Sequence, residues 1–278
     1  MDKQPFNEKK PTSNHTTDKK NKKKSFGFKK FFLALLTLFI VVFLGVGCGL
    51  VAIGLDGDKD VSDIHPPASS QILDMNGNLI TNIHATENRT LVTLDKIPAN
   101  LQNAFIAVED NRFYEHNGID PRGIFRAIYS NLTSGEVAEG GSTITQQLAK
   151  NAFLSQDRTF KRKIQEFFIA LRLERQYTKE EILEMYLNQI YFGRGAYGVQ
   201  AAAQTYFGKD VSQLDLSECA MLAGIPRSPN YYSPLNNLGA ANERKAEVLD
   251  QMVKYGYIDS TTAAKTKDES LRLVNNKK

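Results

Sequence analysis

The sequence predicts a mainly α-helical domain that is preceded by one transmembrane helix. Three observations support this fold class: an uncharged apolar run at residues 31–55, helical periodicity almost throughout after about residue 97, and a single clear hairpin signal at residues 71–83. The chain contains no internal repeat. We therefore expect residues 71–270 to form one domain, since about 200 residues are enough to bury a core.

The apolar run has the length and composition of a membrane span. It reads FFLALLTLFIVVFLGVGCGLVAIGL and carries no charge. At about 1.5 Å per residue it extends roughly 37 Å, against roughly 30 Å for a bilayer core. A cleaved signal peptide has a shorter apolar region. A lipoprotein signal ending at Cys48 is disfavoured, because Gly45 stands where such signals usually place Leu.

Charge is distributed unevenly and predicts the orientation of this helix. Residues 1–30 carry ten Lys against three acidic residues, whereas the remainder of the chain is slightly acidic. The positive-inside rule places such a tail in the cytoplasm and residues 56–278 outside, in a single-pass protein of the cell membrane. Residues 56–70 are expected to be a linker. Because the basic excess is confined to the tail, we expect no nucleic-acid partner.

Local patterns predict the elements of the outer part. Asn76-Gly77 indicates a hairpin turn, and Thr178 can cap a following helix. Helices are also expected over residues 195–207, 216–222 and 240–255. A further helix has apolar residues spaced on one face: Phe160, Ile164, Phe167, Phe168 and Leu171. The two cysteines, Cys48 and Cys219, are too isolated for a disulfide framework or a CxxC metal site.

Residues 109–118, EDNRFYEHNG, form the first of three clusters that packing explains poorly. Glu109 and Asp110 are adjacent carboxylates near an expected helix end, and His116 follows them. Acid–base chemistry is one interpretation. A capped, solvated turn is the alternative, with the histidine as a structural hydrogen-bonding group.

Residues 140–151, GGSTITQQLAKN, form the second cluster. A Gly-Gly pair leading into Ser and Thr at a helix start exposes backbone N–H groups that suit an anion. Three hydroxyls, two amides and a lysine are costly to bury unless they bond to something. The GxxxxGK[ST] pattern of a P-loop is absent, so nucleotide binding is not indicated.

Residues 157–166, DRTFKRKIQE, form the third cluster. Lys163 and Glu166 are three residues apart and therefore neighbours on one helix face, which Ala170 and Glu174 continue. Taken alone, the segment is compatible with an ordinary solvated ion pair.

The chain resembles one family in five ordered motifs. These are EDNRFYEHNG, GGSTITQQLAKN, RKIQEFFIALRLE, EILEMYLNQIYFG and AMLAGIPRSPNYYSP. They are similar to those of the peptidoglycan glycosyltransferases, which comprise the glycosyltransferase domain of class A penicillin-binding proteins and the monofunctional biosynthetic transglycosylases. The resemblance implies a lysozyme-like fold with a small membrane-associated jaw subdomain. It also implies polymerisation of lipid II in cell wall biosynthesis, with inversion and release of undecaprenyl diphosphate.

The resemblance assigns roles to individual residues. Glu109 matches the base that accepts a proton from the attacking sugar hydroxyl, and Glu166 matches a second essential glutamate. Positions that contact the diphosphate are matched by Lys150, Arg158 and Lys163. Sugar or phosphate oxygens would be positioned by Ser142, Gln146 and Gln147.

Cofactor and partner expectations also follow from the resemblance. The implied partners are lipid II, the growing glycan, the membrane and other cell-wall synthesis proteins. No cofactor is required; a divalent cation, Mg or Mn, assists some relatives, but no dedicated metal cage is evident. Glu166 is expected either to orient the donor or to coordinate a cation near the diphosphate.

Two rival functions and one departure from the family remain. A muramidase with a lysozyme-like cleft would need an acidic glutamate but no cluster of cations. A non-catalytic glycan-binding scaffold would be indicated by loss of a glutamate or cation, and all of them are present. The SxxK and KTG motifs of a transpeptidase do not occur in this sequence. We therefore expect no transpeptidase domain, in either a monofunctional enzyme or a shortened relative of the bifunctional group.

Overall fold

A computed structural model describes residues 36–37, 49, 70–73, 79–83, 88–134, 140–154, 157 and 159–274. The chain divides into two units, residues 1–49 and 50–278, and the following description concerns the second. The predicted tail, nearly all of the predicted membrane helix and the linker up to residue 69 lie outside the described residues. Among the residues that are described, no helix has the length and apolar character needed to cross a bilayer.

Short strands form two small sheets. Strand β1 (Ser70–Leu73) pairs with β2 (Leu79–Ile83) in an antiparallel ladder, which confirms the predicted hairpin. Strand β3 (Asn88–Arg89) pairs in parallel with β4 (Ala196–Tyr197).

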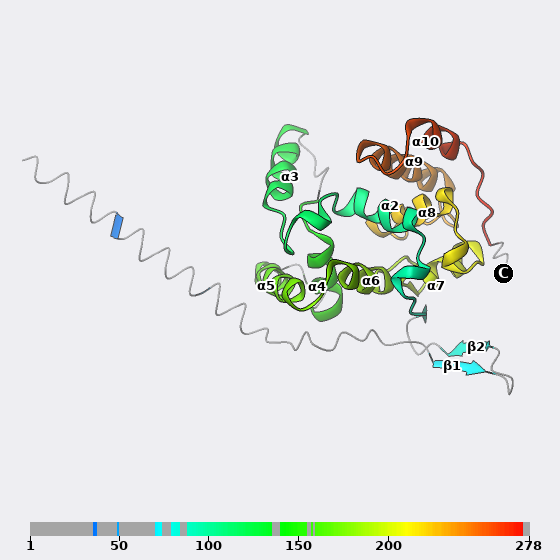
Figure 1. Cartoon of the computed structure of the whole chain (residues 1–278), viewed down its shortest axis with the longest axis horizontal. Coiled ribbons are helices and arrows are strands. Elements are labelled where there is room, and N and C mark those ends of the chain that lie inside the picture. Colours follow the sequence, from blue (N-terminus) through cyan, green and yellow to red (C-terminus); the bar gives the residue numbers. More distant parts are fainter. Residues whose placement is uncertain are drawn as a thin grey trace, which may run out of the picture. The chain divides into compact units, whose positions relative to one another are not determined.

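Helices make up most of the described residues of the second unit, which confirms the mainly α prediction (Figure 1). They are α2 (Ala99–Glu109), α3 (Pro121–Ser134), α4 (Ile144–Phe153), α5 (Phe160–Gln176), α6 (Lys179–Gln189), α7 (Val199–Phe207), α8 (Leu216–Gly224), α9 (Leu238–Lys254) and α10 (Ser260–Lys267). Four short 3-10 turns join them: η1 (Leu94–Lys96), η2 (Phe113–Glu115), η3 (Val211–Gln213) and η4 (Ile225–Arg227).

Local side-chain bonds explain where several helices begin. Thr178 accepts a hydrogen bond from the backbone N–H of Glu181, whose side chain accepts one from the N–H of Thr178 in return, as predicted for this cap. The same reciprocal capping box starts α4 at Thr143 and α8 at Asp215. Each box satisfies two backbone donors that a helix start otherwise leaves unpaired.

Helix α2 lies at the centre of the core. It packs against α8 and α9, while α4 packs against α5 and α6 (Figure 1). The Phe105 ring of α2 meets the rings of Tyr186 and Phe192 edge-to-face, with centroids 6.0 and 6.1 Å apart. All three side chains are fully buried, so one apolar core fixes the position of the C-terminal end of α2.

The apolar stripe predicted on α5 does not form its core face. Phe160 is 79% exposed and Phe167 is 38% exposed, although the helix itself is confirmed. The buried residues are Ile169, Ala170 and Leu173, together with Glu166. The buried face of α5 therefore includes a small residue and a charged one, which a hydrophobicity pattern alone does not reveal.

The helix predicted over residues 195–207 begins later, at Val199. Ala196 and Tyr197 are extended, and Gly198 has φ +81°. A Cβ at Gly198 would lie 2.7 Å from the carbonyl oxygen of Asn188, so the chain turns here through a conformation that only glycine adopts easily.

Candidate functional site

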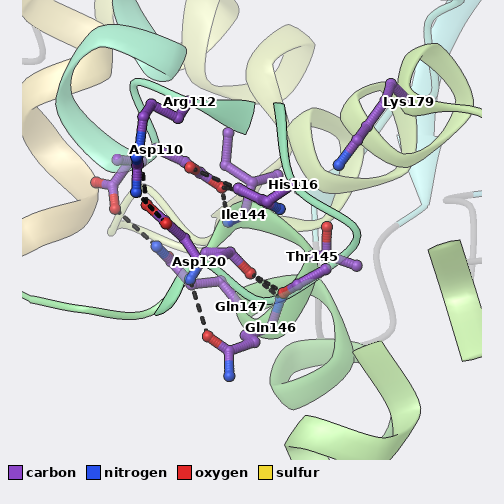
Figure 2. A network of polar contacts seen from close by, with 12 residues as sticks. Asp110, Arg112, His116, Asp120, Ile144, Thr145, Gln146, Gln147 and Lys179 are labelled. Atoms are coloured by element: carbon purple, nitrogen blue, oxygen red, sulfur yellow. Dashed lines mark hydrogen bonds and ion pairs between the residues drawn. The ribbon is translucent and has the colours of Figure 1, made fainter. Parts of the chain in front are cut away.

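Asp110 links the end of α2 to the start of α4 (Figure 2). Its Oδ2 accepts hydrogen bonds from the backbone N–H of Ile144 at 3.0 Å and from Nε2 of His116 at 2.8 Å. Asp110 and His116 are both buried. Because Asp110 ends the helix that carries Glu109, this link fixes the first predicted cluster against the second.

These contacts correct the expectation of unpaired N–H groups at this helix start. Asp110 accepts a hydrogen bond from the N–H of Ile144, and the Thr143 hydroxyl accepts one from the N–H of Gln146 at 3.1 Å. Both donors are therefore bonded within the protein, and the carboxylate of Asp110 already occupies the position expected for an anion. The reason is a contact between residues 34 apart in the chain, which no local pattern reveals.

The two neighbouring glutamines of α4 have different partners. Gln147 donates from Nε2 to Oε2 of Glu109 at 2.8 Å. Gln146 is only 3% exposed, and its Oε1 accepts from the N–H of Thr143 at 3.0 Å to complete the capping box. Gln147 thus faces the predicted base, while Gln146 is engaged in starting the helix.

Arg112 and Asp120 form an ion pair beside this link (Figure 2). The guanidinium Nε lies 3.2 Å from Oδ2 of Asp120. Desolvation opposes ionisation of Asp120, but hydrogen bonds from Arg112 and the N–H of Gly123 outweigh it and hold the pKa of this carboxyl below its usual value. A Cβ at Gly123 would lie 2.4 Å from Oδ2 of Asp120, so the pair leaves no room for a larger residue.

Three of the predicted residues meet at the start of α5. Glu166 is 2% exposed, and its two oxygens accept from Lys163 Nζ and from Arg162 Nη1, the latter at 3.1 Å. Lys163 also donates to Oγ of Ser142 at 2.9 Å. The pair of Lys163 and Glu166 is therefore a buried-carboxylate cluster, unlike the solvated ion pair that the segment alone allows. Sequence reasoning missed Arg162, although its position four residues before Glu166 is a usable signal.

Lys150 of α4 is partly buried and lies in the electrostatic field of both glutamates. Desolvation lowers the pKa of Lys150, against the opposing influence of the Glu166 and Glu109 carboxylates. Arg158, the remaining predicted cation, lies outside the described residues.

Glu109 lines a cavity of about 320 Å³. Ser142 and Thr143 line it on the α4 side, and cationic side chains from α3, η4 and α9 complete it: Arg126, Arg227, Arg244 and Lys254. Sequence analysis did not single out these four cations. Three of them follow Glu109 by more than a hundred positions, and only folding brings them to the same cavity.

The residues present do not fit a divalent cation at Glu166. Both carboxylate oxygens accept hydrogen bonds from cationic side chains, Arg162 and Lys163, whose positive charge disfavours a metal ion on the same carboxylate. Within the described ranges, no group of three or more His, Cys, Asp or Glu is arranged to hold a metal ion.

A family model described as Transglycosylase matches residues 76–253. The chain belongs to the transglycosylase family. This confirms the resemblance drawn from the five motifs.

Relatives of this transglycosylase are penicillin-binding proteins. Penicillin-binding protein 1F of Bacillus subtilis (strain 168) is 45% identical over 249 residues, covering 88% of this chain and 34% of the relative. Penicillin-binding protein 1A of Escherichia coli (strain K12) is 46% identical over 247 residues, covering 88% and 29%. The crystal structure of penicillin-binding protein 1A from Haemophilus influenzae aligns with TM-score 0.45 and 27% identity, over 75% of this chain and 22% of that one. The transglycosylase chain thus spans between about a fifth and a third of the length of these relatives.

Proposed function

We propose that this chain is a peptidoglycan glycosyltransferase that polymerises lipid II into glycan strands and releases undecaprenyl diphosphate. One observation carries the proposal within the family. A glutamate held by an amide lines a cavity that cationic side chains also line, and Lys150 lies in the electrostatic field of this glutamate. Transfer from a lipid diphosphate requires both a base and fixed positive charge.

Glu109 acts as the base in this proposal. A sugar hydroxyl of the acceptor attacks the anomeric carbon of the growing chain, and its proton passes to the Glu109 carboxylate. The new glycosidic C–O bond forms as the bond from the same carbon to the diphosphate breaks, with inversion. Because Glu109 lines the cavity, an acceptor hydroxyl placed there comes within reach of its carboxylate.

Lys150, Lys163 and Arg158 stabilise the departing diphosphate. Fixed cations contribute most where negative charge develops in the transition state. Glu166 holds Lys163 and Arg162 in place through its two oxygens, and Ser142 bonds to the same lysine. The role of Glu166 is thus donor-side positioning of cations, because both of its oxygens accept hydrogen bonds from them.

Attachment to the membrane belongs to the same proposal. Three large apolar side chains on α3 are exposed at a helical spacing: Phe125 at 73%, Tyr129 at 65% and Leu132 at 78%. Such a face suits the membrane-associated subdomain of an enzyme with a lipid-linked substrate. A helix at residues 31–55 would hold the domain outside the cell with the Lys-rich tail in the cytoplasm.

Purified full-length protein in detergent, supplied with labelled lipid II, tests the function. We expect glycan polymer and undecaprenyl diphosphate from the wild type. Glu109→Gln is expected to lower turnover at least about 100-fold, because an amide cannot accept the proton, while the thermal unfolding midpoint stays near that of the wild type. Digestion of purified sacculi without turnover of lipid II would instead identify a muramidase.

A further inference from the structure

We propose that Tyr186 is a positioning residue for Glu109, acting through the side chain of Gln147. A hydrogen-bonded relay runs from the Tyr186 hydroxyl to the Gln147 amide and on to the Glu109 carboxylate. The inference deepens the proposed function, since it concerns how the base of that reaction is oriented.

The direction of this relay is fixed by the chemistry of its two ends. A carboxylate only accepts hydrogen bonds, so the Gln147 amide must present its NH₂ group to Glu109, at 2.8 Å. Its carbonyl oxygen is thereby turned away from Glu109 and requires a donor. The Tyr186 hydroxyl donates to that oxygen at 3.4 Å. A side chain that could only accept would not hold the amide in this orientation.

The surroundings of Tyr186 keep its hydroxyl a donor. The side chain is fully buried on α6, and its ring packs edge-to-face against Phe105. Burial, reinforced by the negative charges of Glu109 and Asp110, raises the pKa of Tyr186 well above its usual value. The hydroxyl therefore stays protonated wherever Glu109 can act as a base.

The relay restrains one carboxylate oxygen and leaves the other for chemistry. Gln147 bonds to Oε2 of Glu109, while within the described part of the chain Oε1 receives no hydrogen bond. Glu109 also lines the cavity. The geometry thus assigns proton acceptance to Oε1, with Oε2 held from behind by the core of the domain.

Charged groups around Glu109 form a constant background for this test. They come from the elements that line the cavity or lie near the carboxylate: Asp110, Asp120, Arg126, Lys150, Arg227, Arg244 and Lys254. Removing the hydroxyl of Tyr186 alters none of them. A change confined to that hydroxyl therefore reports on the relay.

Tyr206 provides a matched control. It is also fully buried, and its hydroxyl donates to the carbonyl oxygen of Phe192 at 2.7 Å. Tyr206→Phe therefore deletes the same atom from the same kind of environment without touching the relay. Loss of one buried hydroxyl contact is expected to lower stability to a similar extent in both variants.

The first experiment compares Tyr186→Phe with Tyr206→Phe in the full-length protein, using labelled lipid II across the pH range. Tyr186→Phe is expected to lower kcat about tenfold with KM within about twofold, the contribution of one ordinary hydrogen bond. The acidic limb of its kcat/KM profile should move to higher pH, because a weaker donor stabilises the ionised carboxylate less. Tyr206→Phe should leave kcat and the profile unchanged.

A double-mutant cycle separates the relay from two independent effects. Gln147→Met keeps the length of the side chain and removes both polar ends. If Tyr186 acts through Gln147, adding Tyr186→Phe to Gln147→Met changes kcat and the acidic limb no further. Additive effects of the two substitutions would overturn the relay.

A readout without substrate keeps the relay testable apart from the proposed function. The ¹³C carboxyl resonance of Glu109, identified by its loss in Glu109→Gln, is followed in a pH titration. Its midpoint should rise in Tyr186→Phe and stay in place in Tyr206→Phe. Identical titrations in both variants would overturn the relay, whereas a wild type that fails to polymerise lipid II would overturn only the proposed function.

Discussion

Two glutamates in this molecule are buried to the same extent but differ in their hydrogen-bond partners. Glu166 of α5 and Glu218 of α8 are each 2% exposed, and each accepts a hydrogen bond from a partly exposed lysine. The Glu218 oxygens accept from Lys209 Nζ at 2.6 Å and from the backbone N–H of Asp215 at 3.1 Å. One of its two bonds therefore completes the capping box that starts its own helix.

Glu166, by contrast, caps nothing. Both of its oxygens accept hydrogen bonds from cationic side chains, those of Arg162 and Lys163. The same lysine also donates a hydrogen bond to Ser142, 21 residues away. Burial alone therefore does not separate a structural carboxylate from one in a functional cluster. The partners do: a backbone donor within three residues indicates a cap, whereas two cations next to a cavity-lining segment indicate a charged site.

Among the tests of this difference between Glu166 and Glu218, the largest expected effect is the loss of activity in Glu166→Gln. An amide cannot hold two cations, so Lys163 and Arg162 lose the geometry that is proposed to serve the diphosphate. Each charge-assisted bond contributes about 1.5–3 kcal/mol, and we expect turnover of lipid II to fall roughly 100-fold. Initial rates with labelled lipid II measure this. Turnover within about threefold of the wild type would remove Glu166 from the site.

Glu218→Gln should lower the stability of the protein and leave its activity unchanged. The amide oxygen can serve only one of the two present donors, so the free energy of unfolding is expected to fall by about 2 kcal/mol. Turnover measured well below the unfolding midpoint should match that of the wild type. Denaturant titration gives the first quantity and the lipid II assay the second. A loss of turnover in the fully folded variant would break the distinction between the two glutamates.

The lysine partners offer a milder form of the same test. Lys163→Ala is expected to slow turnover about tenfold, near the lower limit for a charge-assisted contact, because this side chain is 46% exposed and solvent screens it. Lys209→Ala removes a lysine that is 36% exposed and should change turnover less than about twofold. Equal effects of the two alanine substitutions on lipid II turnover would contradict the assignment of Lys163 to the diphosphate.

The smallest effect concerns Asp120, a structural carboxylate inside the site region. Its pKa lies below the ordinary value, so its stabilising contribution is complete above about pH 4 and is lost as pH falls through the folded-state pKa. Asp120→Asn should therefore lower the free energy of unfolding by about 1 kcal/mol at neutral pH and by progressively less in acid. Urea titrations at a series of pH values test whether this stability difference shrinks in acid. A difference that grows in acid would show that the ion pair with Arg112 is not its source.

The sequence predicts those features whose causes lie within a few residues. Asn76-Gly77 predicts the hairpin, and Thr178 predicts the start of α6, because turn conformations and helix caps are local. The five motifs likewise contain residues that carry the proposed chemistry, among them Glu109, Gln147, Lys150, Lys163 and Glu166. The rotation of α5 and the late start of α7 could not be predicted, because α5 packs against α4 and Gly198 lies against the backbone of Asn188.

The sequence by itself therefore determined the helical class, the Thr178 cap and the family, and it supplied the residues that are proposed to carry the chemistry. Only the tertiary structure decided how those residues are used. Asp110 occupies the start of α4 from 34 residues away, and Tyr186 reaches Gln147 across 39. Arg227 and Arg244 join Glu109 at one cavity. Such contacts arise from packing of the whole core around α2, whose energy is shared among many distant residues, so no short stretch of sequence encodes them.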